Sequence, residues 1–178
     1  MRALSLRVLA PLPVTALAAL TLAACASSSR PAAAPCTPAG LRVTAGYTQG
    51  AGQHAIYGLR FTNVSGTACT LQGHPGVSLV TAGNSGGRPI GSPRPLLMPG
   101  QDPGVTTVTL APGQHALALL GIAETVAFTG LTCSPVAAHW LKVYPPHASR
   151  AVYVPVTVIT CSAPPDQILE ISPVYPDS

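Results

Sequence analysis

The stretch LRVTAGYTQGAGQHAIYGLRFTN, from Leu41 to Asn63, decides the fold class of this chain. Along 41–47, apolar residues alternate with polar or small ones, which is the period of two of a half-buried β-strand. Residues 54–63 repeat this pattern. Because the Gly-rich segment 49–53 between them is typical of a turn, we expect a β-hairpin here.

Two cysteines flank this hairpin. Cys36 precedes the first strand, Cys69 follows the second, and the midpoint between them falls at the Gly-rich turn. A hairpin folded at that turn brings both cysteines to its open end. We therefore predict a disulfide between Cys36 and Cys69, in a chain exported to an oxidising compartment.

A second hairpin is expected late in the chain, where strands over 137–144 and 151–159 flank the turn PPHASR. The midpoint of Cys133 and Cys161 lies within that turn, so we predict a second disulfide between them. Each bridge closes a loop of roughly 30 residues, which stabilises the fold by about 3.5 kcal/mol in the chain-entropy model. Free or metal-binding thiols are the alternative, but no C-x-x-C spacing or paired His accompanies these cysteines.

Further short strands are expected between the hairpins, over 70–72, 77–81, 105–110 and 115–122. No segment has a convincing helical period, and the 20 Pro and 17 Gly of the chain suit many turns. We therefore predict an all-β chain folded as an antiparallel β-sandwich of about seven to nine strands.

The sequence also predicts where two residues of the second hairpin lie. Pro155 interrupts a valine-rich strand, so we expect that strand at a sheet edge or beside a bulge. Trp140 is the single Trp of the chain, and we expect it in the core rather than in a ligand-stacking position.

The N-terminus has the pattern of a secretory signal. Residues 1–7 carry two Arg and no acid, and residues 8–24 are apolar apart from two Thr. A transmembrane helix is the alternative, but Pro11 and Pro13 interrupt an apolar run that is shorter than the ~20 residues a bilayer span needs.

The sequence LAAC, Leu22 to Cys25, resembles the bacterial lipobox. The resemblance implies cleavage just before Cys25 and a diacylglycerol or acyl anchor, such as palmitate, on its sulfur. Two or more long acyl chains hold a protein stably at a membrane. We therefore expect a removed signal peptide over 1–24, a lipidated cysteine with a flexible tether over 25–35, and the β-sandwich domain over 36–178.

The charge of the chain gives no support for a nucleic-acid partner. Only 8% of residues are charged, and the part after residue 24 has seven basic and five acidic side chains. The basic residues are scattered singly along the chain. This composition does not predict binding to nucleic acid.

Two longer blocks carry a family resemblance: FTNVSGTACTLQGHPGVSLV, Phe61 to Val80, and LAPGQHALALL, Leu110 to Leu120. Together with the later LTCSP and LKVYPP, they resemble a family of secreted actinobacterial proteins called domain of unknown function 4232, over about residues 36–174. The resemblance implies an immunoglobulin-like sandwich that is often lipid-anchored, and it supplies no activity and no catalytic residue. Both blocks also contain residues that are typical of turns, so they can be explained by structure alone.

One motif imitates an enzyme. GNSGG, Gly83 to Gly87, places Ser85 where trypsin-like proteases and G-x-S-x-G hydrolases carry their nucleophile. A trypsin-like site needs an acid upstream of the serine, but no Asp or Glu precedes Asp102. A hydrolase elbow needs a helix directly after the serine, and the glycines and proline that follow Ser85 disfavour one. A serine hydrolase that uses Ser85 is therefore kept only as an alternative.

Metal and carboxylate sites are also weakly indicated. The five His have no short-range pairing, and Met98 is the only Met after the N-terminal segment, so a secreted metal-binding protein is the other alternative. The five acids offer no pair that sequence can place. We expect no catalytic residue, no cofactor and no metal, and a protein that is not an enzyme.

These features together predict a lipoprotein held at the extracytoplasmic face of the cell membrane. Its sandwich is expected to act as a binding or envelope-structural module, with an envelope component or an external protein as partner. The expected contact surface is the loop-rich segment Gly83 to Gly104, because a loop of about 20 residues in a compact domain is usually functional or disordered.

Overall fold

The computed structural model of the chain describes residues 32–82, 87, 89–91, 93–95, 104–128, 133–162 and 168–177. The chain divides into two units, Met1–Pro31 and Ala32–Ser178, and the described residues all belong to the second. Cys25, Ser85 and most of the segment from Gly83 to Gly104 lie outside the described residues. The predictions about them therefore stay predictions.

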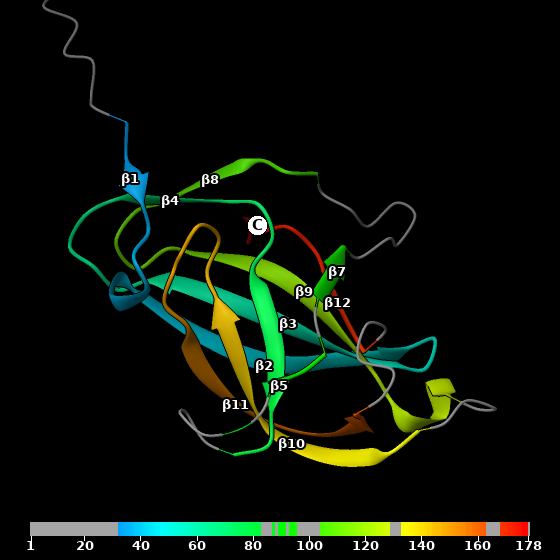
Figure 1. Cartoon of the computed structure of the whole chain (residues 1–178). Coiled ribbons are helices and arrows are strands. Elements are labelled where there is room, and N and C mark those ends of the chain that lie inside the picture. Colours follow the sequence, from blue (N-terminus) through cyan, green and yellow to red (C-terminus); the bar gives the residue numbers. More distant parts are fainter. Residues whose placement is uncertain are drawn as a thin grey trace, which may run out of the picture. The chain divides into compact units, whose positions relative to one another are not determined.

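Strands make up most of the described residues (Figure 1). In chain order they are β1 (Ala34–Pro35), β2 (Leu41–Ala51), β3 (His54–Asn63), β4 (Cys69–Gln72), β5 (Gly76–Val80), β6 (Pro89–Ile90), β7 (Pro93–Pro95), β8 (Thr107–Leu110), β9 (His115–Ala123), β10 (Pro135–Tyr144), β11 (Val152–Cys161), β12 (Leu169–Ile171) and β13 (Tyr175–Pro176). Two short 3₁₀ helices, η1 (Pro38–Gly40) and η2 (Thr125–Phe128), join them. Within the described ranges no helix is long and apolar enough to cross a membrane.

The strands form three sheets. The largest has the order β2-β3-β9-β12-β7, with β13 also paired to β9; the second is β11-β10-β5-β6; and a small one is β1-β4-β8. All pairings are antiparallel except β1 with β4 and β7 with β12. Buried residues of all three sheets belong to one hydrophobic cluster. The predicted all-β sandwich is therefore confirmed.

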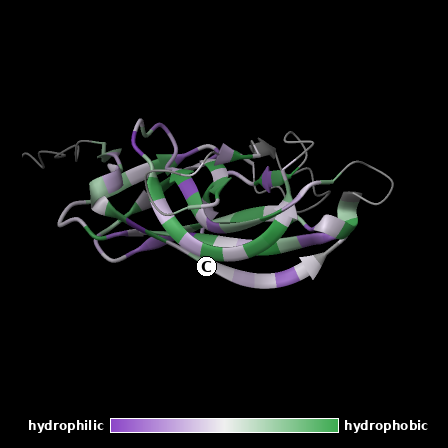
Figure 2. Cartoon of the chain, turned by 60° about the horizontal axis from the view of Figure 1, so that its bottom comes forward, coloured by the Kyte–Doolittle hydropathy of each residue, from purple (hydrophilic) through white to green (hydrophobic). Residues whose placement is uncertain are grey.

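Alternation along the long strands builds this core. Leu59 and Phe61 of β3, Leu120 of β9, and Leu79 and Leu141 of the second sheet are all fully buried. Figure 2 shows hydrophobic and hydrophilic residues following one another along the strands. Because burial of one such side chain contributes about 1.5–3 kcal/mol, the sheets are held together mainly by these facing apolar rows.

The first hairpin, β2–β3, matches its prediction except at the turn. The strands stay paired up to Ala51 and His54, so the loop contains only Gly52 and Gln53, both with positive φ. The predicted turn over 49–53 was therefore too wide. An additional residue, Thr48, shifts the register in β2, and its hydroxyl donates to the carbonyl of Ile56 at 2.9 Å. Because of this bulge, the strands pair again beyond Thr48 as far as the hairpin tip, and the side chains there change direction.

The second hairpin, β10–β11, confirms the expectation for Pro155. β11 is the last strand of its sheet, and the register with β10 shifts between Ala138 and Trp140, which pairs with Pro155. The expectation for Trp140 was wrong. Ala138, Leu141 and Val143 are fully buried while Trp140 is only partly buried, so the register shift turns the Trp to the outer face of the sheet.

Both disulfides are confirmed. Cys36 and Cys69 are bonded across a sequence separation of 33 residues, and Cys133 and Cys161 across 28. The second bridge lies where β10 begins, because Pro135 pairs with Cys161. Each bridge therefore closes a hairpin at its open end, as the cysteine spacing predicted.

All eight strands expected from the sequence are present, and they are the described strands of four or more residues. The prediction missed five segments of two or three residues, β1, β6, β7, β12 and β13. Such segments are too short for an alternating pattern. They are strands because a distant partner pairs with them, as Leu169–Ile171 does with β9.

Candidate functional site

Three exposed apolar side chains gather at one hollow of the surface. Tyr47, Val126 and Ile159 are 62%, 55% and 61% exposed, and among the described residues only five large hydrophobic side chains are exposed. All three line a hollow of about 420 Å³. The other two, Val64 and Val105, do not. Clustered apolar exposure of this kind marks interaction sites more often than scattered exposure does.

The floor of the hollow is made of core residues. Ala55 and Val158 are 4% and 8% exposed, and the half-buried ring of Tyr57 packs against the core. The ring of Tyr47 meets that of Tyr57 edge to face, with centroids 5.7 Å apart and an interplanar angle of 78°. This geometry is a favourable one for aromatic pairs and fixes the position of the exposed ring.

The β2–β3 hairpin holds Tyr47 in place. Tyr47 is directly opposite Tyr57, immediately before the register shift at Thr48. Its hydroxyl lies beside Gly50, since a Cβ on that glycine would be 3.4 Å from the Tyr47 oxygen. The glycine-rich tip therefore leaves room for a Tyr side chain that lies along the strand.

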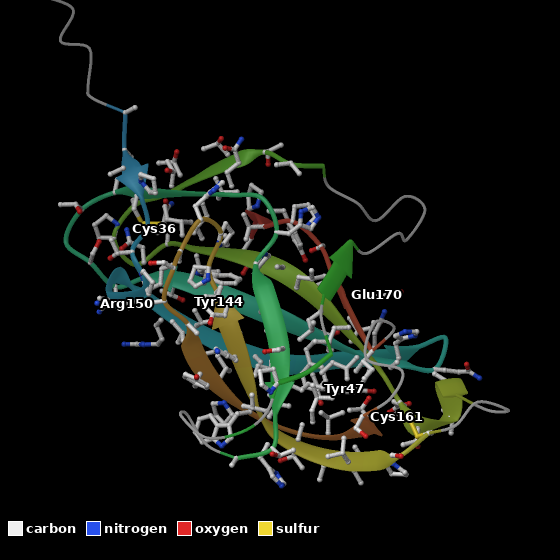
Figure 3. The ribbon with its side chains drawn as sticks, viewed as in Figure 1. Cys36, Tyr47, Tyr144, Arg150, Cys161 and Glu170 are labelled. Atoms are coloured by element: carbon white, nitrogen blue, oxygen red, sulfur yellow. A yellow bond between two sulfur atoms is a disulfide. The ribbon has the colours of Figure 1, made fainter. Side chains whose placement is uncertain are left out.

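Hydrogen bonds join the three walls of the hollow. The amide of Glu124, just before η2, donates to the carbonyl of Gln53 at the hairpin tip at 3.0 Å. From β11, the buried hydroxyl of Thr160 donates to the carbonyl of Ala123 at 2.7 Å. The Cys133–Cys161 disulfide ties the end of β11 to the start of β10. Figure 3 shows that Tyr47 and Cys161 lie at the same end of the domain. These bonds fix the positions of the elements that form the hollow.

The chemistry of the hollow is apolar with one acid. Of the described residues that line it, only Glu124 is charged, and Thr125 and Thr157 add hydroxyl groups. Burial raises the pKa of Tyr57 above its ordinary value, and the neighbouring Tyr47 and Glu124 raise it further. Tyr57 therefore stays neutral and able to donate a hydrogen bond. The arrangement suits binding an apolar group that has a positive charge beside it.

A second feature, the buried Asn63, explains the two sequence blocks that carry the family resemblance. Its amide nitrogen donates to the carbonyls of Thr67 and Leu110 at 2.8 and 2.9 Å, and its side-chain oxygen accepts from Ser65. Its backbone carbonyl also accepts from the amide of Gly113 at 2.8 Å. Asn63 thus joins the turn after β3 to the turn between β8 and β9, and the blocks read as structure rather than as a reactive site.

A family model described as "Domain of unknown function (DUF4232)" matches residues 36–175, which include both blocks. The chain belongs to the DUF4232 family. No curated protein and no solved structure matches the chain.

The other sites considered in the sequence of this DUF4232 domain are only partly described. Ser85 and Cys25 lie outside the described residues. Among the described residues, no group of three or more His, Cys, Asp or Glu side chains is placed to hold a metal ion. The predicted contact segment from Gly83 to Gly104 is mostly outside the described ranges as well.

One charged cluster was not foreseen. His115 is partly buried, and its Nε2 lies 2.6 Å from a carboxylate oxygen of Asp177, which also pairs with Arg60 at 3.2 Å. These residues lie on β3, on β9 and after β13, so no local pattern brings them together. The hollow was missed for the same reason, because its three exposed apolar residues come from β2, η2 and β11.

Proposed function

We propose that this DUF4232 chain is a membrane-anchored, extracytoplasmic lipoprotein whose β-sandwich binds another protein. The observation that supports a binding function is the hollow, which is lined by the exposed side chains of Tyr47, Val126 and Ile159. Exposing three large apolar side chains together has a cost in solubility that a partner surface would remove. The anchor is supported by the lipobox-like LAAC sequence that ends at Cys25.

The chemistry of the hollow defines the partner. Apolar walls and the neutral Tyr57 favour an inserted aliphatic or aromatic side chain, and Glu124 favours a Lys or Arg next to it. A protein segment that presents such a pair fits the hollow better than a nucleic acid, whose phosphates would meet Glu124. An envelope protein or an external protein could supply this segment.

Site-specific photo-crosslinking in cells tests the binding function. A photoreactive amino acid at position 159 should give one defined crosslinked partner, and the same amino acid at position 64 should not, although Val64 is also exposed. With that partner purified, we expect Tyr47→Ala to weaken binding about 30-fold, the effect of losing an aromatic contact of about 2 kcal/mol. Val64→Ala is the matched control and should leave binding unchanged.

Two results would contradict this assignment. One is a partner captured equally well from positions 159 and 64. The other is a partner that is retained by Tyr47→Ala but lost when 83–103 is deleted, which would move the binding surface to the loop-rich segment predicted from the sequence.

The anchor is tested by Cys25→Ser. This exchange removes the only sulfur to which the lipobox chemistry could attach a lipid, so we expect loss of palmitate incorporation and release of the protein from the membrane fraction. Ser27→Ala, two residues later, is the control and should keep both properties. Absence of labelled palmitate from the wild-type protein would refute the lipoprotein proposal and leave the binding hollow untouched.

A further inference from the structure

The outer face of the second sheet carries an aromatic row. Along β10, Leu141 and Val143 point into the core, whereas Trp140, Lys142 and Tyr144 alternate with them and point outward. All three outward residues are partly buried, so neighbouring residues cover part of each side chain. The face is open at Lys142, whose ammonium group is exposed to solvent, whereas beside Trp140 the described Gly87 lies against Val80.

Neighbouring strands continue the row on both sides. Lys142 is directly opposite Tyr153 of β11 and Ser78 of β5. Tyr144 is opposite Gly76, and a Cβ on this glycine would be 3.4 Å from the Cβ of Tyr144. Trp140 is opposite the exposed Pro155 on one side and the buried Val80 on the other. Trp140, Tyr144 and Tyr153 therefore form an aromatic platform beside small residues, with a single cation, Lys142, at its centre.

The central cation lies over the ring of a neighbouring tyrosine. The ammonium nitrogen of Lys142 lies 5.3 Å from the ring centroid of Tyr144. The pKa of Lys142 is raised, chiefly by its hydrogen bond with the Tyr144 side chain and in part by Tyr153 across the strands. Lys142 is therefore charged over the whole physiological range, and its rotamer freedom is reduced.

Charge is divided unevenly between the two sheets. β5, β6, β10, β11 and the turn between β10 and β11 contain Lys142 and Arg150 but no Asp or Glu. The described acids, Glu124, Glu170 and Asp177, all lie on or beside strands of the largest sheet. Figure 3 shows Arg150 and Tyr144 toward the end of the β10–β11 hairpin that carries its turn. The platform therefore favours an anion.

We propose that this outer face, centred on Lys142 between Tyr144 and Tyr153, binds an acidic polysaccharide. Sugar rings have one face of C–H groups, which packs on the negative face of an aromatic ring, and the rings of Trp140, Tyr144 and Tyr153 supply such surfaces. A carboxylate or phosphate on the sugar would meet Lys142. This site differs from the hollow at Tyr47 in its residues and its charge, and it does not depend on the function proposed for that hollow.

A membrane surface is the other anionic occupant of an aromatic and basic face, and the structure favours it less. Interfacial binding needs apolar side chains that insert below the headgroups, but Trp140, Tyr144 and Tyr153 are all partly buried. Two cations also attract an anionic leaflet only weakly. A flat ligand that stacks on the platform satisfies both observations.

Titration with defined polymers and vesicles tests the proposal. The full chain carrying Cys25→Ser, so that no lipid contributes, is titrated with polygalacturonate, with uncharged dextran and with vesicles of phosphatidylglycerol and phosphatidylcholine. We expect binding to polygalacturonate alone. Lys142→Gln and Tyr153→Ala should each weaken it about tenfold, while Arg42→Gln, which removes an exposed cation from β2, should weaken it less than twofold.

Thermal unfolding of each variant checks that the fold is kept, and Trp140→Phe, which retains a ring, should bind nearly as the parent does. Equal losses with Lys142→Gln and Arg42→Gln would overturn the proposal, because they would mean unspecific charge attraction. Equal binding of dextran, absence of polygalacturonate binding, or binding of the vesicles in its place would overturn it as well, the last by making the face a membrane contact.

Discussion

Asn63 uses both ends of its side-chain amide inside the protein. It has no exposed surface, and it links the carbonyls of Thr67 and Leu110 to the hydroxyl and amide of Ser65. A buried amide is tolerated only when its hydrogen bonds are made, and here they connect two turns that are far apart in the sequence. The sequence pattern indicated turns at both places, but not that one side chain connects them.

We expect Asn63→Ala to lower the free energy of unfolding by about 1–3 kcal/mol, because the exchange removes the side-chain donor to the buried carbonyl of Leu110, whereas the carbonyl of Thr67 keeps the hydroxyl of Ser65 as a donor. Denaturant unfolding followed by circular dichroism measures the change. Gln114→Ala is the control: its exposed side chain accepts one hydrogen bond from the amide of Ala111, and water can replace it. Similar losses for the two variants would show that the burial of Asn63 is not what matters.

At the scale of elements, the two hairpins are the units that the sequence describes best. Their strands have a period of two, their turns are rich in Gly or Pro, and their cysteines are placed symmetrically about the turns. Both disulfides followed from this symmetry. Short strands such as β12 and β13 could not be predicted, because pairing with β9 rather than local composition makes them extended.

Removing one disulfide should cost stability without changing the fold. We expect Cys36→Ala with Cys69→Ala to lower the free energy of unfolding by about 3.5 kcal/mol, because the unfolded chain gains the entropy of an open loop of 33 residues. Alanine is chosen because both positions are buried and a serine hydroxyl would need a partner.

The matched pair, Cys133→Ala with Cys161→Ala, opens a loop of 28 residues and should lose nearly the same amount. Unfolding in guanidinium chloride compares the two variants with the parent. A loss below about 1 kcal/mol for either variant would mean that loop entropy is not the main contribution of that bridge.

At the scale of the whole folded domain, the two proposed binding surfaces differ in their chemistry. The described acids lie with the largest sheet, whereas the charged side chains on the described strands and hairpin turn of the second sheet, Lys142 and Arg150, are basic. The hollow at Tyr47 is apolar with the acid Glu124, whereas the platform at Lys142 is aromatic and cationic. We expect the two surfaces to bind different chemical classes, so that Tyr47→Ala and Lys142→Gln each affect only one ligand.

The sequence by itself determined the all-β class, the positions of the eight longer strands, the two hairpins and both disulfides. These follow from periods and spacings within about 30 residues, over which alternation and turn composition act locally. The tertiary structure alone decided which side chains converge. Tyr47, Val126 and Ile159 meet because β11 packs against both β2 and η2, and Trp140 faces outward because the register shifts between Ala138 and Trp140. A one-residue shift turns a side chain to the other face of a sheet, and composition does not encode it.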